Sequence, residues 1–271
     1  MVRQGQRRFM LSFWFPCTAT NHDCGNVAYP FNNDTGASGM KKFILIALLA
    51  AGTAGAASPH LHAVTLKAVT IKTENTKQVI DIQYPQGFAN PQINQAIELL
   101  IQSIRQSFDK ADPDAQNLPA DVPGKDGLTI TYKVMFDNQQ AVSVLFNVSA
   151  YRRGAAHPNN TVQTLNFING KPVVLGELFK ENTNALQKMA DFSYEAIKKK
   201  AINDDEQWLR EGTKATVENY KNWYFSSKGI SIAFDPYQVA AYVYGPQTVT
   251  IPRAVIQDAL RSDVIKAVWG N

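Results

Sequence analysis

The 271-residue chain has only two cysteines, and both of them, Cys17 and Cys24, precede the internal methionine Met40. The remainder of the chain can therefore form no disulfide, thiol nucleophile, thiolate zinc site or iron–sulfur cluster. The sequence also contains neither a G-x-G-x-x-G nor a G-x-x-x-x-G-K-[ST] motif. These absences argue against the common glycine-rich modes of dinucleotide and nucleotide binding.

Histidine is also scarce, with four in the whole chain, and only His157 lies in the part expected to fold. A zinc hydrolase normally uses two or three histidines with a carboxylate, and no H-E-x-x-H pair is present. A serine triad needs a single histidine, but no serine stands in a G-x-S-x-G elbow. We therefore predict no metal site, no cofactor and no catalytic residue.

Residues 40–57 have the order of a secretory signal peptide. A basic start, Met40-Lys-Lys, precedes an apolar run over residues 43–51 and a small-x-small cleavage site over residues 54–56. The apolar run is shorter than the roughly 20 residues that span a bilayer. We predict translation from Met40, a spurious or disordered extension over residues 1–39, and a periplasmic or secreted product that does not span the membrane after cleavage.

Charge gives no reason to expect nucleic-acid binding. The formal net charge of the full chain is +4, but residues 58–271 contain 22 Lys and Arg against 21 Asp and Glu, a net charge of about +1. Binding to nucleic acid requires a concentrated basic face. The run of three lysines over residues 198–200 fits better as the solvated last turn of a helix.

Hydrophobic periodicity predicts an α+β fold. Strands are expected within residues 64–84, followed by a helix that starts at Asn90-Pro91, an N-cap followed by proline at the first helical position. Residues 128–175 alternate apolar and polar side chains around an Asn169-Gly170 turn, which predicts an antiparallel meander. Further helices are expected over residues 182–201, over residues 214–223 and from Pro252, with a hairpin over residues 224–234 and a strand over residues 248–251. The strands and helices are segregated, so we predict an α+β class with an antiparallel meander sheet and packed helices.

The stretch YRRGAAHPNN, residues 151–160, is the first candidate site. Pro158 favours an extended conformation at His157, and the imidazole can donate to a nearby carbonyl and fix the loop. That structural role is the more common one for a single histidine. The alternative is a histidine beside a groove, with Arg152 and Arg153 contacting an anion.

A second candidate lies at residues 234–252, where Tyr237, Tyr242 and Tyr244 follow the turn-forming Asp235-Pro236. These tyrosines are either half-buried with paired hydroxyls or part of an aromatic surface for a glycan or protein partner. Both this stretch and the His157 loop interrupt strand patterns, so we expect them to flank one surface. A glycosidase would need only two carboxylates, for which Glu177, Glu195 and Asp235 are available, although their spacing singles out none.

Several of these motifs together resemble one bacterial family. They are Tyr151 with G-A-A-H-P from Gly154, N-G-K from Asn169, Leu178-Phe179, G-I-S-I-A-F-D-P-Y from Gly229, and G-P-Q-T-V-T-I-P from Gly245. The pattern is similar to the extracytoplasmic domains of RsiV-type anti-sigma factors and PdaC-type peptidoglycan deacetylases. The resemblance implies two intimately associated α+β halves, a PdaC-like half over residues 64–168 and an RsiV-like half over residues 169–260.

In the family, this domain binds lysozyme in the anti-sigma factor and accompanies a separate catalytic domain in the deacetylase. The present sequence shows no sigma-binding segment and no deacetylase domain, so neither activity is expected to carry over. We therefore predict an exported binding module that recognises lysozyme or peptidoglycan without catalysis. The alternative is a peptidoglycan-modifying enzyme that uses carboxylates and His157.

Overall fold

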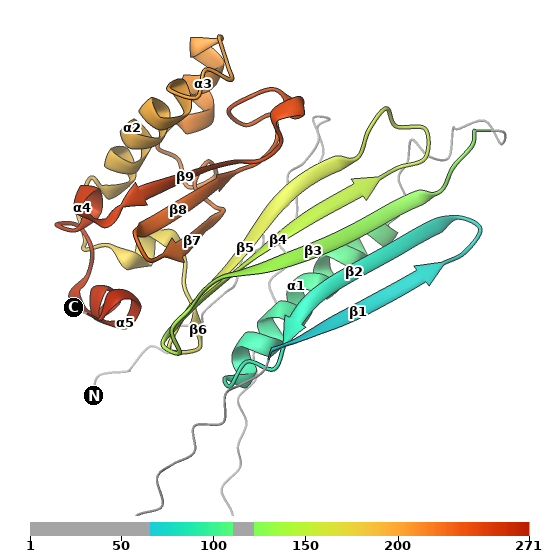
Figure 1. Cartoon of the computed structure of the whole chain (residues 1–271), viewed down its shortest axis with the longest axis horizontal. Helices are drawn as coiled ribbons and strands as arrows, with labels where there is room; N and C mark the ends of the chain where they lie inside the picture. The colour runs from blue at the N-terminus through green and yellow to red at the C-terminus, as the bar shows by residue number, and fades with distance from the viewer. Residues whose placement is uncertain (1–65, 111–121, 271) are drawn as a thin grey trace, which may run out of the picture. The chain divides into compact units, whose positions relative to one another are not determined.

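The structure is a computed structural model that describes residues 66–110 and 122–270 (Figure 1). The predicted N-terminal extension and signal peptide lie outside these residues. The strands form one sheet of six and one of three. The elements of the first sheet and its helix are β1 (Lys67–Glu74), β2 (Gln78–Gln86), α1 (Pro91–Asp109), β3 (Asp126–Asp137), β4 (Ala141–Tyr151), β5 (Asn159–Ile168) and β6 (Lys171–Pro172).

The remaining elements surround the second sheet and include two 3-10 helices, η2 and η3. They are η2 (Leu175–Leu178), α2 (Ala185–Lys198), α3 (Glu206–Thr213), β7 (Trp223–Ser226), β8 (Gly229–Phe234), η3 (Tyr242–Tyr244), β9 (Gln247–Pro252), α4 (Arg253–Ile256) and α5 (Ser262–Trp269). The segregation of strands and helices confirms the predicted α+β class. None of the helices in the described part of the chain is long and apolar enough to cross a membrane.

The six-stranded sheet follows the chain order β1 to β6, but it is not antiparallel throughout, because β2 and β3 run parallel. The connection between them contains α1, and a crossover of this kind is what parallel neighbours require. Asn90 accepts a hydrogen bond from the Gln92 N–H and Pro91 occupies the first turn, as predicted. The apolar stripe of α1 packs on one face of the sheet and forms a core with the buried residues Ile80, Ile82, Leu128, Ile130 and Phe146.

The opposite face of β4 and β5 packs against β7 and β8, where Leu145 and Val162 contact Tyr224 and Ala233. A second core lies under the three-stranded sheet and contains α2, α4 and α5, with Met189, Ile232 and Leu260 among its buried residues. The six-stranded sheet is therefore buried on one face by α1 and partly covered on the other by the second sheet.

β7 is an edge strand whose outward backbone groups are paired with side chains of the other sheet. The Trp223 N–H donates to Thr164 Oγ1 (3.1 Å), and its carbonyl accepts from Asn166 Nδ2 (2.7 Å). The Phe225 N–H donates to Ser143 Oγ (3.0 Å), which itself donates to Asn166 Oδ1 (2.6 Å). Buried backbone groups must find partners, and here polar side chains of β4 and β5 supply them.

Two expectations for the second half are wrong. Residues 214–223 form turns and the start of β7, whereas the helix α3 lies earlier, at Glu206–Thr213. Its start is set by Asp205, whose carboxylate accepts from the Trp208 N–H (2.9 Å). The helix predicted from Asn182 begins later, at Ala185, because Asn182 has a left-handed backbone with φ of 56°.

Candidate functional site

His157, Tyr237 and Tyr242 form an aromatic cluster between the β4–β5 connection and the loop that follows β8. The rings of His157 and Tyr242 are stacked, with centroids 4.4 Å apart and an interplanar angle of 27°. The Tyr237 ring lies 5.4 Å from Tyr242 and 6.3 Å from His157. The structure thus brings together three of the predicted site residues, from segments about 80 residues apart in the sequence.

Polar contacts fix the orientation of this aromatic cluster. The Tyr242 hydroxyl donates to the Pro158 carbonyl (3.1 Å) and accepts from Asn160 Nδ2 (2.6 Å). His157 Nδ1 lies 2.9 Å from the same carbonyl. Because a carbonyl can only accept, Nδ1 carries the proton, and Nε2 of the neutral ring remains an acceptor. The histidine therefore both fixes its loop and presents an exposed ring edge.

The loop that carries the tyrosines is also the most apolar exposed segment of the described chain. Tyr237, Val243 and Tyr244 are 52%, 84% and 49% exposed, and they are three of the seven exposed large hydrophobic side chains in the described residues. Exposed hydrophobic groups concentrated in this way mark an interaction surface more often than scattered ones do. Tyr244 lies on this loop but is not stacked on the aromatic cluster.

Helix α3 holds this loop in place through hydrogen bonds to its backbone and side chains. The Trp208 indole N–H donates to the Tyr237 carbonyl (2.9 Å), and Gln238 Nε2 donates to the Gly212 carbonyl (3.0 Å). A Cβ at Gly212 would lie 1.9 Å from the Gln238 carbonyl oxygen, so only glycine allows this approach. These supporting residues and Asn160 were not predicted, because no local pattern indicates which distant loop a helix end will contact.

Arg152 and Arg153 do not join the aromatic cluster. Arg152 donates to the Phe108 carbonyl at the end of α1, lies 4.2 Å over the Phe108 ring, and pairs with Asp126 at 3.1 Å. The Arg153 N–H donates to the other oxygen of Asp126 (2.8 Å). These contacts do not support the alternative in which both arginines hold an anion beside His157, because Arg152 bonds the end of α1 and both arginines bond Asp126 at the start of β3.

Asp235 connects the loop to the large sheet. One carboxylate oxygen accepts from the Val162 N–H of β5 (2.6 Å), and the other faces Asn222 Nδ2 (3.4 Å) and Lys221 Nζ (3.6 Å). Burial raises the pKa of this carboxyl, while the Val162 N–H and the Lys221 ammonium act in the opposite direction. A half-buried carboxylate with a raised pKa beside an aromatic surface is a candidate acid–base group.

The raised pKa of Asp235 predicts the direction in which stability changes with pH. The Asp235 carboxyl binds a proton more readily in the folded protein than in the unfolded chain, where its pKa has the ordinary value of 3.8. The contribution of this group to stability is therefore fully present below 3.8 and is lost as pH rises through the raised folded value. We expect the free energy of unfolding of the wild type, relative to Asp235→Asn, to decrease with rising pH in chemical denaturation. A difference that increases with pH would show that the carboxylate is stabilised in its charged form.

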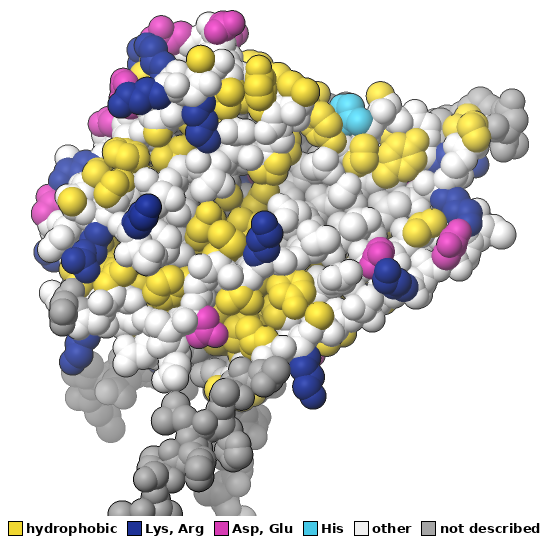
Figure 2. Space-filling model, in the orientation of Figure 1, with side chains coloured by type: hydrophobic (Ala, Val, Ile, Leu, Met, Phe, Trp, Pro, Cys, Tyr) yellow, Lys and Arg dark blue, Asp and Glu magenta, His cyan; other side chains and the backbone are white. Residues whose placement is uncertain are grey.

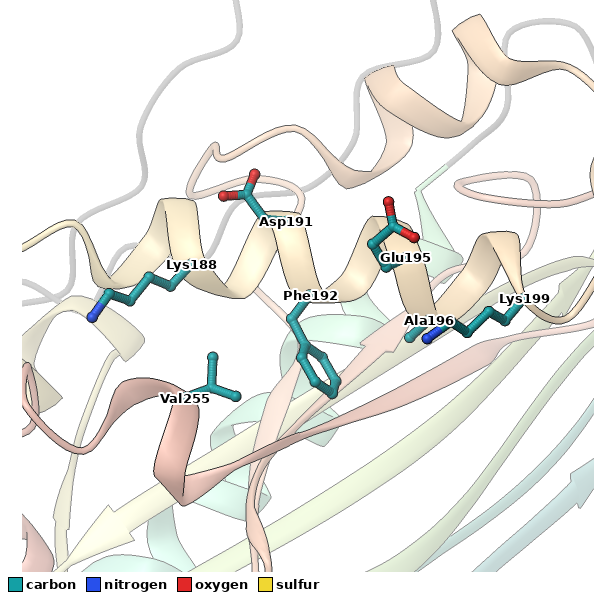
Figure 3. Close-up of a pocket in the computed structure, with 7 residues that line it drawn as sticks. All are labelled: Lys188, Asp191, Phe192, Glu195, Ala196, Lys199 and Val255. Carbon is teal, nitrogen blue, oxygen red and sulfur yellow. The ribbon is translucent and has the colours of Figure 1, made fainter.

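A groove of about 700 Å³ lies elsewhere, between α2 and α4 (Figure 3). Of the candidate site residues considered in the sequence, only the carboxylate Glu195 lines it. The close-up shows Phe192 and Val255 facing each other, while Asp191 and Glu195 point away from this apolar contact. Lys188 pairs with Asp258 (2.6 Å) and Asp191 accepts from Gln187 (2.8 Å). The polar groups of this groove do not converge, unlike those of a typical ligand site. Within the described residues no group of three or more His, Cys, Asp and Glu could hold a metal ion.

Two family models match the chain in consecutive segments. Residues 71–160 match the model described as Deacetylase PdaC, and residues 176–254 match the model described as Protein of unknown function (DUF3298). The peptidoglycan-N-acetylmuramic acid deacetylase PdaC of Bacillus subtilis (strain 168) is 29% identical over 187 residues, which are 68% of this chain. The chain spans only 39% of the length of that relative.

Solved structures of the DUF3298 family show the same fold. A member from Bacteroides fragilis NCTC 9343 has a TM-score of 0.56 at 15% identity and covers 75% of this chain and 96% of its own. A second member, from Pseudomonas aeruginosa PAO1, has a TM-score of 0.54 at 12% identity, and the match covers 74% of this chain and 96% of that protein. At such low identity the likeness concerns the fold alone.

These matches correct the functional prediction. We predicted a binding module that recognises lysozyme or peptidoglycan without catalysis, but the curated relative is a named peptidoglycan deacetylase and a PdaC family model matches. They favour the alternative, a peptidoglycan-modifying enzyme. The resemblance drawn from the sequence motifs is confirmed: the chain matches a PdaC model and a DUF3298 model in consecutive segments, is similar to a PdaC deacetylase over most of its length and shares its fold with DUF3298 proteins.

Proposed function

We propose that this protein acts in the enzymatic modification of peptidoglycan outside the cytoplasmic membrane, and that the aromatic cluster holds the sugar that is modified. The observation that supports this proposal best is the stack of His157 on Tyr242 beside Tyr237, on an exposed loop of a PdaC-like chain. Flat aromatic faces contact the apolar C–H faces of pyranose rings, while hydroxyl and imidazole groups bond the sugar hydroxyls.

The name of the curated relative suggests the reaction class. Hydrolysis of an N-acetyl group adds water across the amide bond, so that acetate leaves and the sugar retains an amine. Such a reaction needs a group that removes a proton from water and one that returns a proton to the amine. Asp235 is the carboxylate of the loop next to the aromatic cluster, and its raised pKa fits proton exchange. His157 Nε2 is the second candidate, since it is a free acceptor in the neutral ring.

The direct test is to incubate the purified protein with purified peptidoglycan and to measure both free acetate and the masses of the muropeptides. We expect acetate release with a matching loss of the acetyl mass, and loss of both in Asp235→Asn. A protein that releases no acetate and alters no muropeptide would contradict the proposed activity. Lysozyme, the protein partner implied by the family resemblance, remains a prediction, and the same preparation can be tested for binding it.

Tyr237 offers a sharper version of this test. Its φ of 68° is in the left-handed region, in a turn closed by the Gln238 N–H on the Asp235 carbonyl (3.1 Å). A bulky residue is strained there by about 1–2 kcal/mol, whereas asparagine is tolerated. Loss of ring stacking costs about 0.5–1.5 kcal/mol, so Tyr237→Asn should leave the free energy of unfolding within about 1 kcal/mol of the wild type. We expect its activity on peptidoglycan to fall at least fivefold.

The matched control is Val174→Asn, which replaces an exposed hydrophobic side chain outside the site. It should leave the activity unchanged. If Tyr237→Asn instead destabilises the protein strongly while activity per folded molecule is retained, Tyr237 has only a structural role.

A further inference from the structure

The large sheet has an open face, the surface of β1 to β5 on the side opposite α1 that the second sheet does not cover. Register alternation decides which side chains it holds. Ile82 and Ile130 are paired and point towards α1, so their neighbours Asp81 and Thr129, also paired, point to the open face. Figure 1 shows α1 behind β2 and β3, so Figure 2, in the same orientation, presents this face.

A row of polar side chains crosses this open face from strand to strand. The register pairs Asp81 with Thr129, Thr129 with Ser149, and Ser149 with Asn160. In the next row Thr131 is paired with Asn147, and both are exposed. At the other end of the first row, Asp81 forms an ion pair with Lys72 of β1, with Nζ and Oδ2 3.0 Å apart. Between that ion pair and the aromatic cluster, the first row carries only hydroxyl and amide groups. The second row continues from Asn147 to Val162, which packs against the second sheet. Figure 2 shows a largely white area without charged side chains beside the histidine.

Tyr151 adds an aromatic ring to the same face. The register pairs it with Gly127, and a Cβ at Gly127 would meet only the Tyr151 Cβ, at 3.7 Å. The glycine therefore leaves open space beside a half-buried tyrosine. An aromatic ring opposite a glycine on a sheet is a known way to cover such a gap, and Tyr151 lies two residues from Ser149 on the same face of β4.

The row is continuous with the aromatic cluster. Asn160, its last member, donates from Nδ2 to the Tyr242 hydroxyl (2.6 Å). Asn160 Oδ1 is buried and has no hydrogen-bond partner among the described residues. The hydrogen bond from Nδ2 therefore joins the polar row to the aromatic cluster as one continuous surface, while the buried Oδ1 does not face a ligand.

From these contacts, and resting on the proposed function, we infer that the open face is the extended part of the sugar site. A linear glycan of N-acetylated sugars lies across β3, β4 and β5, with one unit on the aromatic cluster and further units over Ser149 and Tyr151. Hydroxyl and amide side chains match the hydroxyl and acetamido groups of such a chain, which is uncharged along its backbone. Strands are spaced about 4.8 Å apart, close to the length of one sugar unit in a β-1,4-linked chain, so successive strands can contact successive units.

The test measures binding of the full chain to a length series of β-1,4-linked N-acetylglucosamine oligomers, from the dimer to the hexamer, by calorimetry. We expect affinity to rise with length over the first three or four units and then to level off. Tyr151→Ala should weaken hexamer binding at least fivefold and leave dimer binding within twofold. Thr129→Lys, a long side chain at an exposed position of the row, should do the same. Val174→Asn, at an exposed position outside both sites, serves as the control.

The outcomes separate this inference from the proposed function. If Tyr242→Ala weakens binding of every oligomer but Tyr151→Ala and Thr129→Lys do not affect the hexamer, the aromatic cluster holds the sugar and the extended site is wrong. The inference is also overturned if affinity does not depend on length, or if no oligomer binds to the wild type. In the last case, acetate release from whole peptidoglycan would still support the proposed function.

Discussion

Asn166→Ala should destabilise the protein by about 2–5 kcal/mol, the largest effect we expect from a single polar substitution. Asn166 is 5% exposed and holds together the side-chain bonds that pair the edge of β7. Its loss leaves the Trp223 carbonyl without its donor and Ser143 Oγ without its acceptor, both inside the protein. Chemical denaturation should show a lower midpoint with an unchanged slope.

Two further variants make this result specific. Asn166→Asp keeps the shape but replaces the donor to Trp223 with a second acceptor, so it should be at least as destabilising as alanine. Asn147→Ala, on the neighbouring strand at an exposed position, should change stability by less than about 0.5 kcal/mol. A loss for Asn166→Ala as small as that of Asn147→Ala would mean that the β7 edge does not depend on these bonds.

Gly212→Ala should have the second large effect and should impair function as well as stability. The added methyl group would meet the Gln238 carbonyl oxygen at 1.9 Å and Val239 Cγ1 at 3.1 Å, so the loop must move away from α3. Overpacking of this kind costs about 1–3 kcal/mol. Because Tyr237 immediately precedes the displaced residue, we expect peptidoglycan activity to fall at least tenfold, measured as acetate release per folded molecule.

Gly176→Ala is the matched control for this prediction. A Cβ at Gly176 would meet nothing within 4 Å, and its backbone is not in the left-handed region. The substitution should leave the activity unchanged and the stability equal or slightly higher, by up to about 1 kcal/mol, because alanine restricts the unfolded chain. If Gly212→Ala behaves like Gly176→Ala, α3 does not position the loop.

Much of the fold could be predicted because its signals are local. The Asn90-Pro91 start of α1 and its apolar stripe depend only on neighbouring residues, as does the Asn169-Gly170 turn between β5 and β6. The parallel pairing of β2 and β3 could not be predicted in the same way. Alternation indicates that a segment is a strand, but the choice of neighbour depends on how the intervening helix packs.

For the site as well, local patterns could be read from the sequence, whereas contacts between residues far apart in the sequence could not. His157 and Tyr242 were proposed to flank one surface because both lie in loops that interrupt strand patterns, and the structure stacks their rings. The contacts of Arg152 could not be predicted, since an arginine binds whichever carboxylate and carbonyl the fold brings near, here Asp126 and Phe108. Its partners are 26 and 44 residues away in the sequence, beyond the reach of a local pattern.

The paired edge of β7 also bears on whether the two matched segments can be separated. The backbone of β7 lies within the DUF3298 match, whereas Ser143, on which the Phe225 N–H depends, lies within the PdaC match. A gene fragment that encoded only the second segment would produce a sheet with an exposed edge, open to pairing with any other chain. We therefore expect the second segment to misassemble when it is produced without the first, because Ser143 is then absent and the β7 edge is unpaired.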